Sequence, residues 1–93
     1  MILFRNNMNQ LDLHGEDKIG AKIKIEAFLN DNYKIGNREI AIVHGVGKGI
    51  LKKETFDILS RDKRVEEYNI DMFNEGCTLV KLKEKVDKKR QKC

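Results

Sequence analysis

The feature that most constrains this sequence is a short motif that occurs twice. An apolar residue followed by His and Gly stands at residues 13–15 and again at residues 43–45, thirty positions further on. About thirty residues is the length of one β-α-β unit, in which a helix joins two parallel strands. We therefore expect each His-Gly step to end a strand, with both steps at the same edge of one sheet.

The hydrophobic pattern between the two motifs predicts a strand and a helix. Residues 11–14 alternate between apolar and polar and are followed by Gly15, which is typical of a short strand. Residues 17–34 carry apolar side chains at helical spacing, with Asp17 as an N-cap and Gly36 just past the end. The predicted buried face of this helix consists of Ala21, Ile25, Phe28 and Leu29.

The second half of the chain predicts a buried strand, a helix and a hairpin. Residues 39–44 contain an unbroken apolar run, which suits a strand covered on both faces. Residues 65–73 and 78–82 alternate, and the turn signal at residues 74–76 joins them as an antiparallel hairpin. The helix between them has a predicted buried face of Leu51, Thr55, Ile58 and Leu59.

The order β-α-β-α-β-β predicts an α/β fold. We expect a two-layer α/β sandwich with a mixed four-stranded sheet whose first two strands are parallel. Residues 1–10 are interpreted as an N-terminal extension in which residues 2–4 either add an edge strand or stay loose, residues 11–83 as the domain, and residues 84–93 as a basic C-terminal tail. The aromatic side chains predicted to belong to the core are Phe28, Tyr33, Phe56, Tyr68 and Phe73.

The composition indicates one domain and places the positive charge at one end. With 93 residues, 40% of them hydrophobic, and no apolar run of membrane length, the chain is expected to be a monomeric cytoplasmic protein without a membrane partner. Residues 81–93 hold seven basic and two acidic side chains, a net charge of +5, so residues 1–80 carry a net charge of −1. Such a tail either attracts phosphate backbones without sequence preference or keeps a helix end soluble. Cys77 and Cys93 stand in no metal-binding spacing, which predicts free thiols and no zinc site.

Titratable residues gather where the two parallel strands are predicted to end. Asp12 and His14 are two residues apart and share one face of the first strand. His44 ends the second strand, so a carboxylate and two imidazoles are expected to converge at the sheet edge where open α/β sheets bind ligands. A single His at a strand end is more often structural than catalytic, and His44 is also interpreted as an anchor for the loop that follows it.

The loop after the second His is rich in glycine and is followed by lysine. Its glycines allow the backbone to approach an anion closely, and the N-terminus of the next helix adds its amide groups. The spacing fits neither G-x-x-x-x-G-K-[ST] nor G-x-G-x-x-G. The predicted phosphate-binding residues are Gly45, Gly47, Lys48, Gly49, Lys52 and Lys53.

Together the two motifs resemble the Smr (small MutS-related) domain family. The resemblance rests on residues 11–15 (LDLHG) and 42–51 (IVHGVGKGIL), and it closes with residues 78–82 (TLVKL). It implies a nucleic-acid-binding α/β domain of the stand-alone kind, with endonuclease activity on DNA or RNA. The family's D-x-H motif falls on Asp12 and His14, and its glycine loop falls on His44, Gly45, Gly47 and Gly49.

The sequence departs from the family pattern in three places. Glu16 and Asp17 stand where an apolar residue and Thr are common, and two acids close to a phosphate site would repel the substrate. Val46 stands where a basic residue is frequent, with Lys48 following one glycine later. Of the glycines that often precede the last strand, only Gly76 is present.

The predicted function is an endonuclease that cleaves RNA or nicks DNA, with Asp12, His14 and His44 as the catalytic residues. On RNA, His14 would act as general base or acid for attack by the 2′-hydroxyl, and Asp12 would hold His14 in place. Binding of Mg²⁺ by Asp12 is the alternative chemistry, and no other cofactor is expected. The alternative function is a non-catalytic module that binds nucleic acid or the ribosome.

Overall fold

The computed structural model describes residues 9–85, which form four strands and two helices. Their order along the chain is β-α-β-α-β-β, as the sequence predicted. The elements are β1 (Asn9–Asp12), α2 (Lys18–Ile35), β2 (Glu39–Val43), α3 (Ile50–Arg61), β3 (Val65–Asp71) and β4 (Asn74–Leu82).

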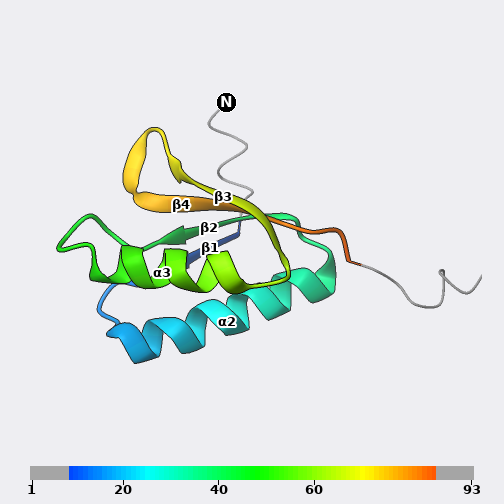
Figure 1. The fold of residues 1–93 in the computed structure, drawn as a ribbon, viewed down its shortest axis with the longest axis horizontal. Coiled ribbons are helices and arrows are strands. Elements are labelled where there is room, and N and C mark those ends of the chain that lie inside the picture. Colours follow the sequence, from blue (N-terminus) through cyan, green and yellow to red (C-terminus); the bar gives the residue numbers. More distant parts are fainter. Residues whose placement is uncertain (1–8, 86–93) are drawn as a thin grey trace, which may run out of the picture.

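The strands form one mixed sheet in the order β1-β2-β4-β3. β1 pairs with β2 in parallel, with Asp12 opposite Val43, and the remaining pairs are antiparallel. Pairing continues one residue past β1, because the backbone N–H of Leu13 donates to the carbonyl of Val43 at 2.9 Å. Both helices lie on the same face of the sheet (Figure 1), so the predicted two-layer sandwich with parallel first strands is confirmed.

The hydrophobic core fills the space between the sheet and the two helices. Alternate residues of β2 and β4 point into it, and each helix contributes the apolar face that its periodicity predicted. α3 adds the fully buried Thr55, whose hydroxyl donates to the carbonyl of Leu51 at 2.7 Å. The core residues are Leu13, Ala21, Ile25, Leu29, Ile40, Ile42, Ile58, Leu59, Val80 and Leu82.

The ends of α2 follow directly from the local sequence. The carboxylate of Asp17 accepts from the backbone N–H of Gly20 at 2.7 Å, which supplies a partner for one of the first amide groups of the helix. Gly36 has a φ of 81°, and its N–H and that of Asn37 close the helix on the carbonyls of Tyr33 and Asn32. The predicted cap and stop signals are therefore confirmed.

The hairpin turn lies earlier than the sequence predicted. β3 ends at Asp71 and β4 begins at Asn74, so Met72 and Phe73 form the turn in place of residues 74–76. The carboxylate of the buried Asp71 accepts the backbone N–H of Phe73 at 2.9 Å, and this side-chain contact ends the alternation. Phe73 is 88% exposed, so its assignment to the core is wrong.

Some sequence-based expectations concern residues that the structure does not describe. The apolar run at residues 2–4 and most of the basic tail, residues 86–93, lie outside the described part of the chain. Within residues 9–85, neither helix is long and apolar enough to cross a membrane.

Candidate functional site

The two His-Gly steps lie at one end of the sheet, where the chain leaves β1 and β2. β1 and β2 run parallel, and the chain leaves the sheet directly after each of them (Figure 1). Gly15 has a φ of 82° and Gly45 a φ of 81°, both in the left-handed region that favours glycine. The repeated motif therefore marks the exits from two neighbouring strands, and it brings residues 13–17 and 44–49 to the same edge.

Asp12 organises the first of these turns through the backbone. Its Oδ1 atom accepts a hydrogen bond from the backbone N–H of His14 at 2.9 Å, the contact that defines an Asx-turn. The His14 side chain is exposed, and no hydrogen bond within residues 9–85 involves its ring. Asp12 thus fixes the path of the chain at His14, whereas the sequence led us to expect a contact between the carboxylate and the ring.

The structure places His44 on the opposite face of the sheet from Asp12. Asp12 precedes Leu13, a core residue on the helix side, so strand alternation turns Asp12 away from the helices. His44 lies on the helix side, edge-on to Phe56 of α3, with the ring centroids 6.5 Å apart. The expected convergence of the three side chains is therefore wrong for His44, which lies on the other face of the sheet from Asp12, and Asp12 is linked to His14 through the backbone.

Both ring nitrogens of His44 have partners inside the protein. Nδ1 lies 3.0 Å from the carbonyl oxygen of Gly45, and Nε2 lies 2.7 Å from the hydroxyl of Thr78. A carbonyl can only accept, so Nδ1 donates and Nε2 accepts the Thr78 hydrogen. Burial lowers the pKa of His44 below its ordinary value, partly offset by the Gly45 carbonyl, and the charge of Lys52 lowers it further. This arrangement favours the interpretation of His44 as an anchor of the loop over a catalytic role.

Gly76 of β4 holds the base of the glycine loop. Its carbonyl accepts the backbone N–H groups of both His44 and Gly45, at 2.8 and 2.9 Å. A Cβ atom at position 76 would lie 3.0 Å from the Cα of Gly45, which is too close for an ordinary contact. Gly76 therefore belongs to the site, although its place in the sequence had predicted no role for it. The signal was available, since a glycine inside a strand often marks a close backbone approach.

The glycine loop offers unused backbone amide groups. No hydrogen bond among the described residues uses the N–H groups of residues 46–52, and Gly49 caps α3 without a side-chain partner. α2 differs, since Asp17 fills the same position there. The free amides and the positive end of the α3 dipole both point out of the helix, which is the geometry that binds phosphate and other anions.

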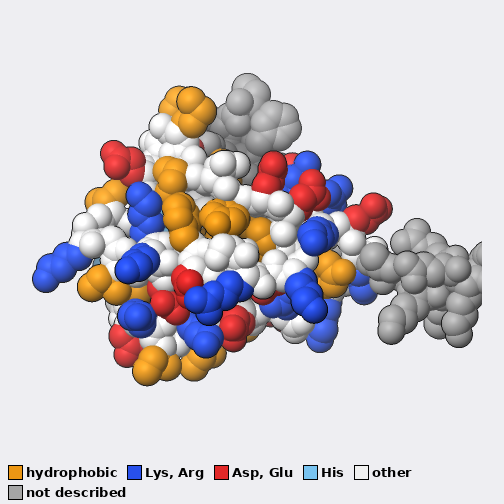
Figure 2. All heavy atoms as spheres, viewed as in Figure 1, with side chains coloured by type: hydrophobic (Ala, Val, Ile, Leu, Met, Phe, Trp, Pro, Cys, Tyr) orange, Lys and Arg blue, Asp and Glu red, His pale blue; other side chains and the backbone are white. Residues whose placement is uncertain are grey.

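The predicted basic residues surround this end of α3. Lys48 and Lys53 are exposed, and Lys52 is half-buried and close enough to influence His44. Figure 2 shows several Lys and Arg side chains around the end of the molecule that carries the loop. Gly47 has an ordinary φ, and a Cβ atom there would meet nothing within 4 Å, so its backbone is open to a ligand.

The two acidic residues before α2 are engaged within the fold. Asp17 caps the helix, and the carboxylate of Glu16 forms an ion pair with Lys24. Both carboxylates therefore have partners in α2. These contacts reduce the repulsion of a phosphate that we expected from two acidic residues at this position. Within residues 9–85, no three His, Cys, Asp or Glu side chains cluster as a metal site would require.

The sequence is similar to a known domain family and to several curated proteins. A family model described as "Smr domain" matches residues 11–83. The chain is 35% identical to Endonuclease MutS2 of Clostridium tetani over 78 residues, and 38% identical to that of Clostridium botulinum strain Eklund 17B over the same length. These matches cover 81% of this chain but 10% of each relative, so the chain spans about a tenth of the length of these curated relatives.

Two solved structures share the fold. The Smr domain of Thermus thermophilus MutS2 superposes with a TM-score of 0.79 at 28% identity, covering 82% of this chain and 99% of that one. YdaL, a stand-alone small MutS-related protein from Escherichia coli, gives the same TM-score at 18% identity, covering 84% of this chain and 66% of that one. At 18% identity, the similarity to YdaL shows a shared fold and nothing more.

Proposed function

The chain belongs to the Smr domain family, and from this membership we propose that it binds nucleic acid at the carboxyl edge of β1 and β2 and cleaves phosphodiester bonds there. The observation that carries the proposal is the pairing, at one sheet edge, of an exposed imidazole with a loop of free amide groups. The curated relatives named Endonuclease MutS2 support the same reaction class.

The substrate phosphate binds at the glycine loop. The amide groups of residues 46–52 donate to its oxygens, and Lys48, Lys52 and Lys53 supply positive charge beside them. The same donors stabilise the additional negative charge that develops on a pentacoordinate phosphorus during cleavage. His44 and Gly76 support this loop from below, since both contact Gly45.

His14 moves the proton. RNA is the substrate we propose, because an imidazole alone is sufficient for attack by a neighbouring 2′-hydroxyl. His14 accepts the hydroxyl proton as the oxygen attacks phosphorus, and the 5′-oxygen of the next nucleotide departs with a proton from solvent or from the imidazolium. The products are a 2′,3′-cyclic phosphate and a 5′-hydroxyl end. Asp12 holds the backbone at His14 and thereby positions the ring.

Cleavage by a His14→Ala variant tests the catalytic half of the proposal. General acid–base groups contribute about 10²–10⁴-fold in rate, so the variant should cut labelled RNA at least about a hundredfold more slowly than the wild type. Its affinity should stay within a few-fold, because phosphate contacts dominate such interfaces. Gln10→Ala, an exposed substitution on the same strand, is the matched control and should cut at the wild-type rate.

Two further arms identify the chemistry. A single 2′-deoxy nucleotide at the cut site should block cleavage, because it removes the nucleophile. EDTA should leave the rate unchanged, and a loss of activity in EDTA would assign Asp12 to Mg²⁺ instead. If the wild type binds RNA and DNA but cuts neither, the enzyme assignment fails and a non-catalytic binding module remains.

A further inference from the structure

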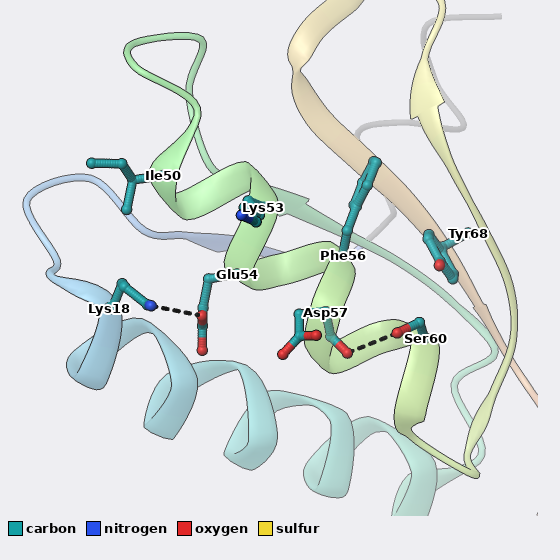
Figure 3. A pocket seen from close by; sticks show the side chains of 8 residues that line it. All are labelled: Lys18, Ile50, Lys53, Glu54, Phe56, Asp57, Ser60 and Tyr68. Atoms are coloured by element: carbon teal, nitrogen blue, oxygen red, sulfur yellow. Dashed lines mark hydrogen bonds and ion pairs between the residues drawn. The ribbon is translucent and has the colours of Figure 1, made fainter.

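A groove beside the glycine loop has the lining of a nucleobase site. It is open to solvent, has a volume of about 820 Å³ and lies over the outer face of α3. Figure 3 shows Phe56 of α3 and Tyr68 of β3 on one side of it, and Lys18, Glu54 and Asp57 on the other, toward α2. Hydrophobic side chains reach the surface in this region (Figure 2).

The two aromatic rings form one wall of the groove. Their centroids lie 5.4 Å apart with an interplanar angle of 57°, and both side chains are half-buried. Tyr68 packs against the core cluster, whereas Phe56 does not belong to it. The prediction that Phe56 belongs to the core is therefore wrong. Its ring lines the groove, where it is available to a ligand. Aromatic rings at the surface are the stacking platforms on which proteins hold unpaired bases.

The charges of the groove favour a neutral ligand. Lys53, at the loop end of the groove, belongs to the phosphate-binding charges. Of the other charged side chains, Lys18 is paired to Glu54 at 3.9 Å and Asp57 to Arg61 at 3.0 Å. A phosphate gains little from such a lining, whereas the phosphate-binding charges lie at the start of α3. A base has a flat apolar face for the rings and polar edges that suit the carboxylates and the hydroxyl of Ser60.

The groove lies within the reach of one nucleotide from the loop. Ile50, which directly follows Gly49, lines one end of it, and Phe56 is six residues further along α3. At 1.5 Å per residue the two positions are about 9 Å apart along the helix axis. Phe56 also contacts His44, the residue that anchors the loop, so the ring and the loop are fixed relative to each other.

We infer that this groove binds one unstacked base of a single-stranded nucleic acid whose phosphate lies on the glycine loop. The inference rests on the proposed function and adds the substrate class, since a base in a duplex cannot reach an aromatic wall without leaving its stack. It makes Phe56 a binding residue that determines the preference for single strands.

The test compares two single strands with the same number of phosphates. One is a ten-nucleotide 2′-deoxy strand, which the proposed RNA cleavage cannot cut, and the other carries abasic sites at every position. The wild type should bind the base-bearing strand about 5- to 100-fold more tightly, as expected from the stacking of one base. Phe56→Leu should remove this preference and leave the affinity for the abasic strand unchanged.

Two further variants keep the test interpretable. Phe73→Leu removes an exposed aromatic ring outside the groove and should keep the wild-type preference. Ser60→Leu places a side chain over Phe56 from an exposed position four residues along α3, and it should reduce the preference even if Phe56→Leu is unstable. Equal wild-type affinity for both strands, or an unchanged preference in both groove variants, would overturn the base site while the loop proposal stands. Binding to neither strand, and to no RNA strand of the same length, would overturn the proposed function itself.

Discussion

The two histidines at the sheet edge differ in their environments, although the sequence around them is alike. His14 and His44 follow equivalent strands in equivalent motifs, yet one imidazole is exposed and the other is 8% exposed with both nitrogens hydrogen-bonded. The difference arises because Asp12, and not Leu13, pairs with Val43, so the two motifs are offset by one residue. His44 therefore takes the inward position that Leu13 takes after β1. The sequence predicted that both residues lie at this edge of the sheet, but it placed the ring of His44 on the wrong face and did not indicate which ring is available for chemistry.

Substitutions of Asp12 distinguish two roles for its side chain, which are to hold the backbone at His14 and to supply a negative charge. Asp12→Asn keeps a side-chain oxygen that accepts the backbone N–H of His14, whereas Asp12→Ala loses it. If Asp12 positions His14 through this contact, the Asn variant should retain RNA cleavage within a few-fold and the Ala variant should lose most of it. Initial rates at saturating RNA measure the difference. Equal, large losses in both variants would show that the negative charge itself is required.

His44 predicts how stability responds to acid. Its pKa in the folded state lies below the unfolded value of about 6.5, so below this pH the unfolded chain binds a proton that the folded chain does not. The contribution of His44 to the free energy of unfolding should therefore be constant above pH 7 and fall by at most about 1.4 kcal/mol per pH unit below 6.5. Urea unfolding between pH 5 and 7.5 measures it. The fall should persist in His14→Ala and be weaker in a folded His44→Gln variant, and identical profiles in all three proteins would contradict it.

At the scale of elements, the periodic segments were predictable and the contacts between them were not. The buried faces of α2 and α3 follow from apolar spacing, and the caps at Asp17 and Gly36 follow from residue type. The predicted position of the hairpin turn was wrong because the carboxylate of Asp71 ends β3 by a local hydrogen bond. The alternation of apolar and polar residues does not indicate this bond. Gly76 supports the loop because β2 pairs with β4. The spacing of apolar residues predicts each strand but not which strands are neighbours, so this contact could not be predicted from the sequence.

The contact between β4 and the glycine loop can be tested with two alanine substitutions. Gly76→Ala places a Cβ atom 3.0 Å from the backbone of Gly45, so the loop must shift. We expect a loss of about 1–3 kcal/mol in the free energy of unfolding, as for other overpacked sites, together with weaker RNA binding. Gly47→Ala has open space and an ordinary φ, so its stability should change by less than about 0.5 kcal/mol. Chemical denaturation of both variants measures this, and equal stabilities would exclude the predicted close approach.

At the scale of the whole molecule, charge is divided between a folded part and a tail. Residues 84–93 carry five basic and two acidic side chains, a net charge of +3, while the site uses lysines of α3 and the loop. The tail was predicted from composition as a source of sequence-independent attraction. Its residues 86–93 lie outside the described part of the chain, so its role remains a prediction from sequence alone.

Removal of residues 84–93 should separate attraction from catalysis. Fewer positive charges release fewer counterions, so the affinity for every nucleic acid should fall and its dependence on salt should become shallower. The rate at saturating RNA should be unchanged, because β4 ends beside the start of β2, at the other end of the sheet from the proposed site. Binding and single-turnover cleavage at several salt concentrations provide the measurement. A lower rate at saturation would show that the tail contributes to the site.

The central claim is that phosphate binds where β1 and β2 end, and backbone amide NMR during titration with a single 2′-deoxy-blocked RNA strand tests it most directly. The free N–H groups of residues 46–52 should show the largest shifts, together with the turn at His14 and Gly15. Gly36 is the internal control, since it is also a left-handed glycine at a helix end but closes α2 instead of opening a helix. Its amide should not move. Shifts centred on residues 36–38, with residues 46–52 unchanged, would contradict the account.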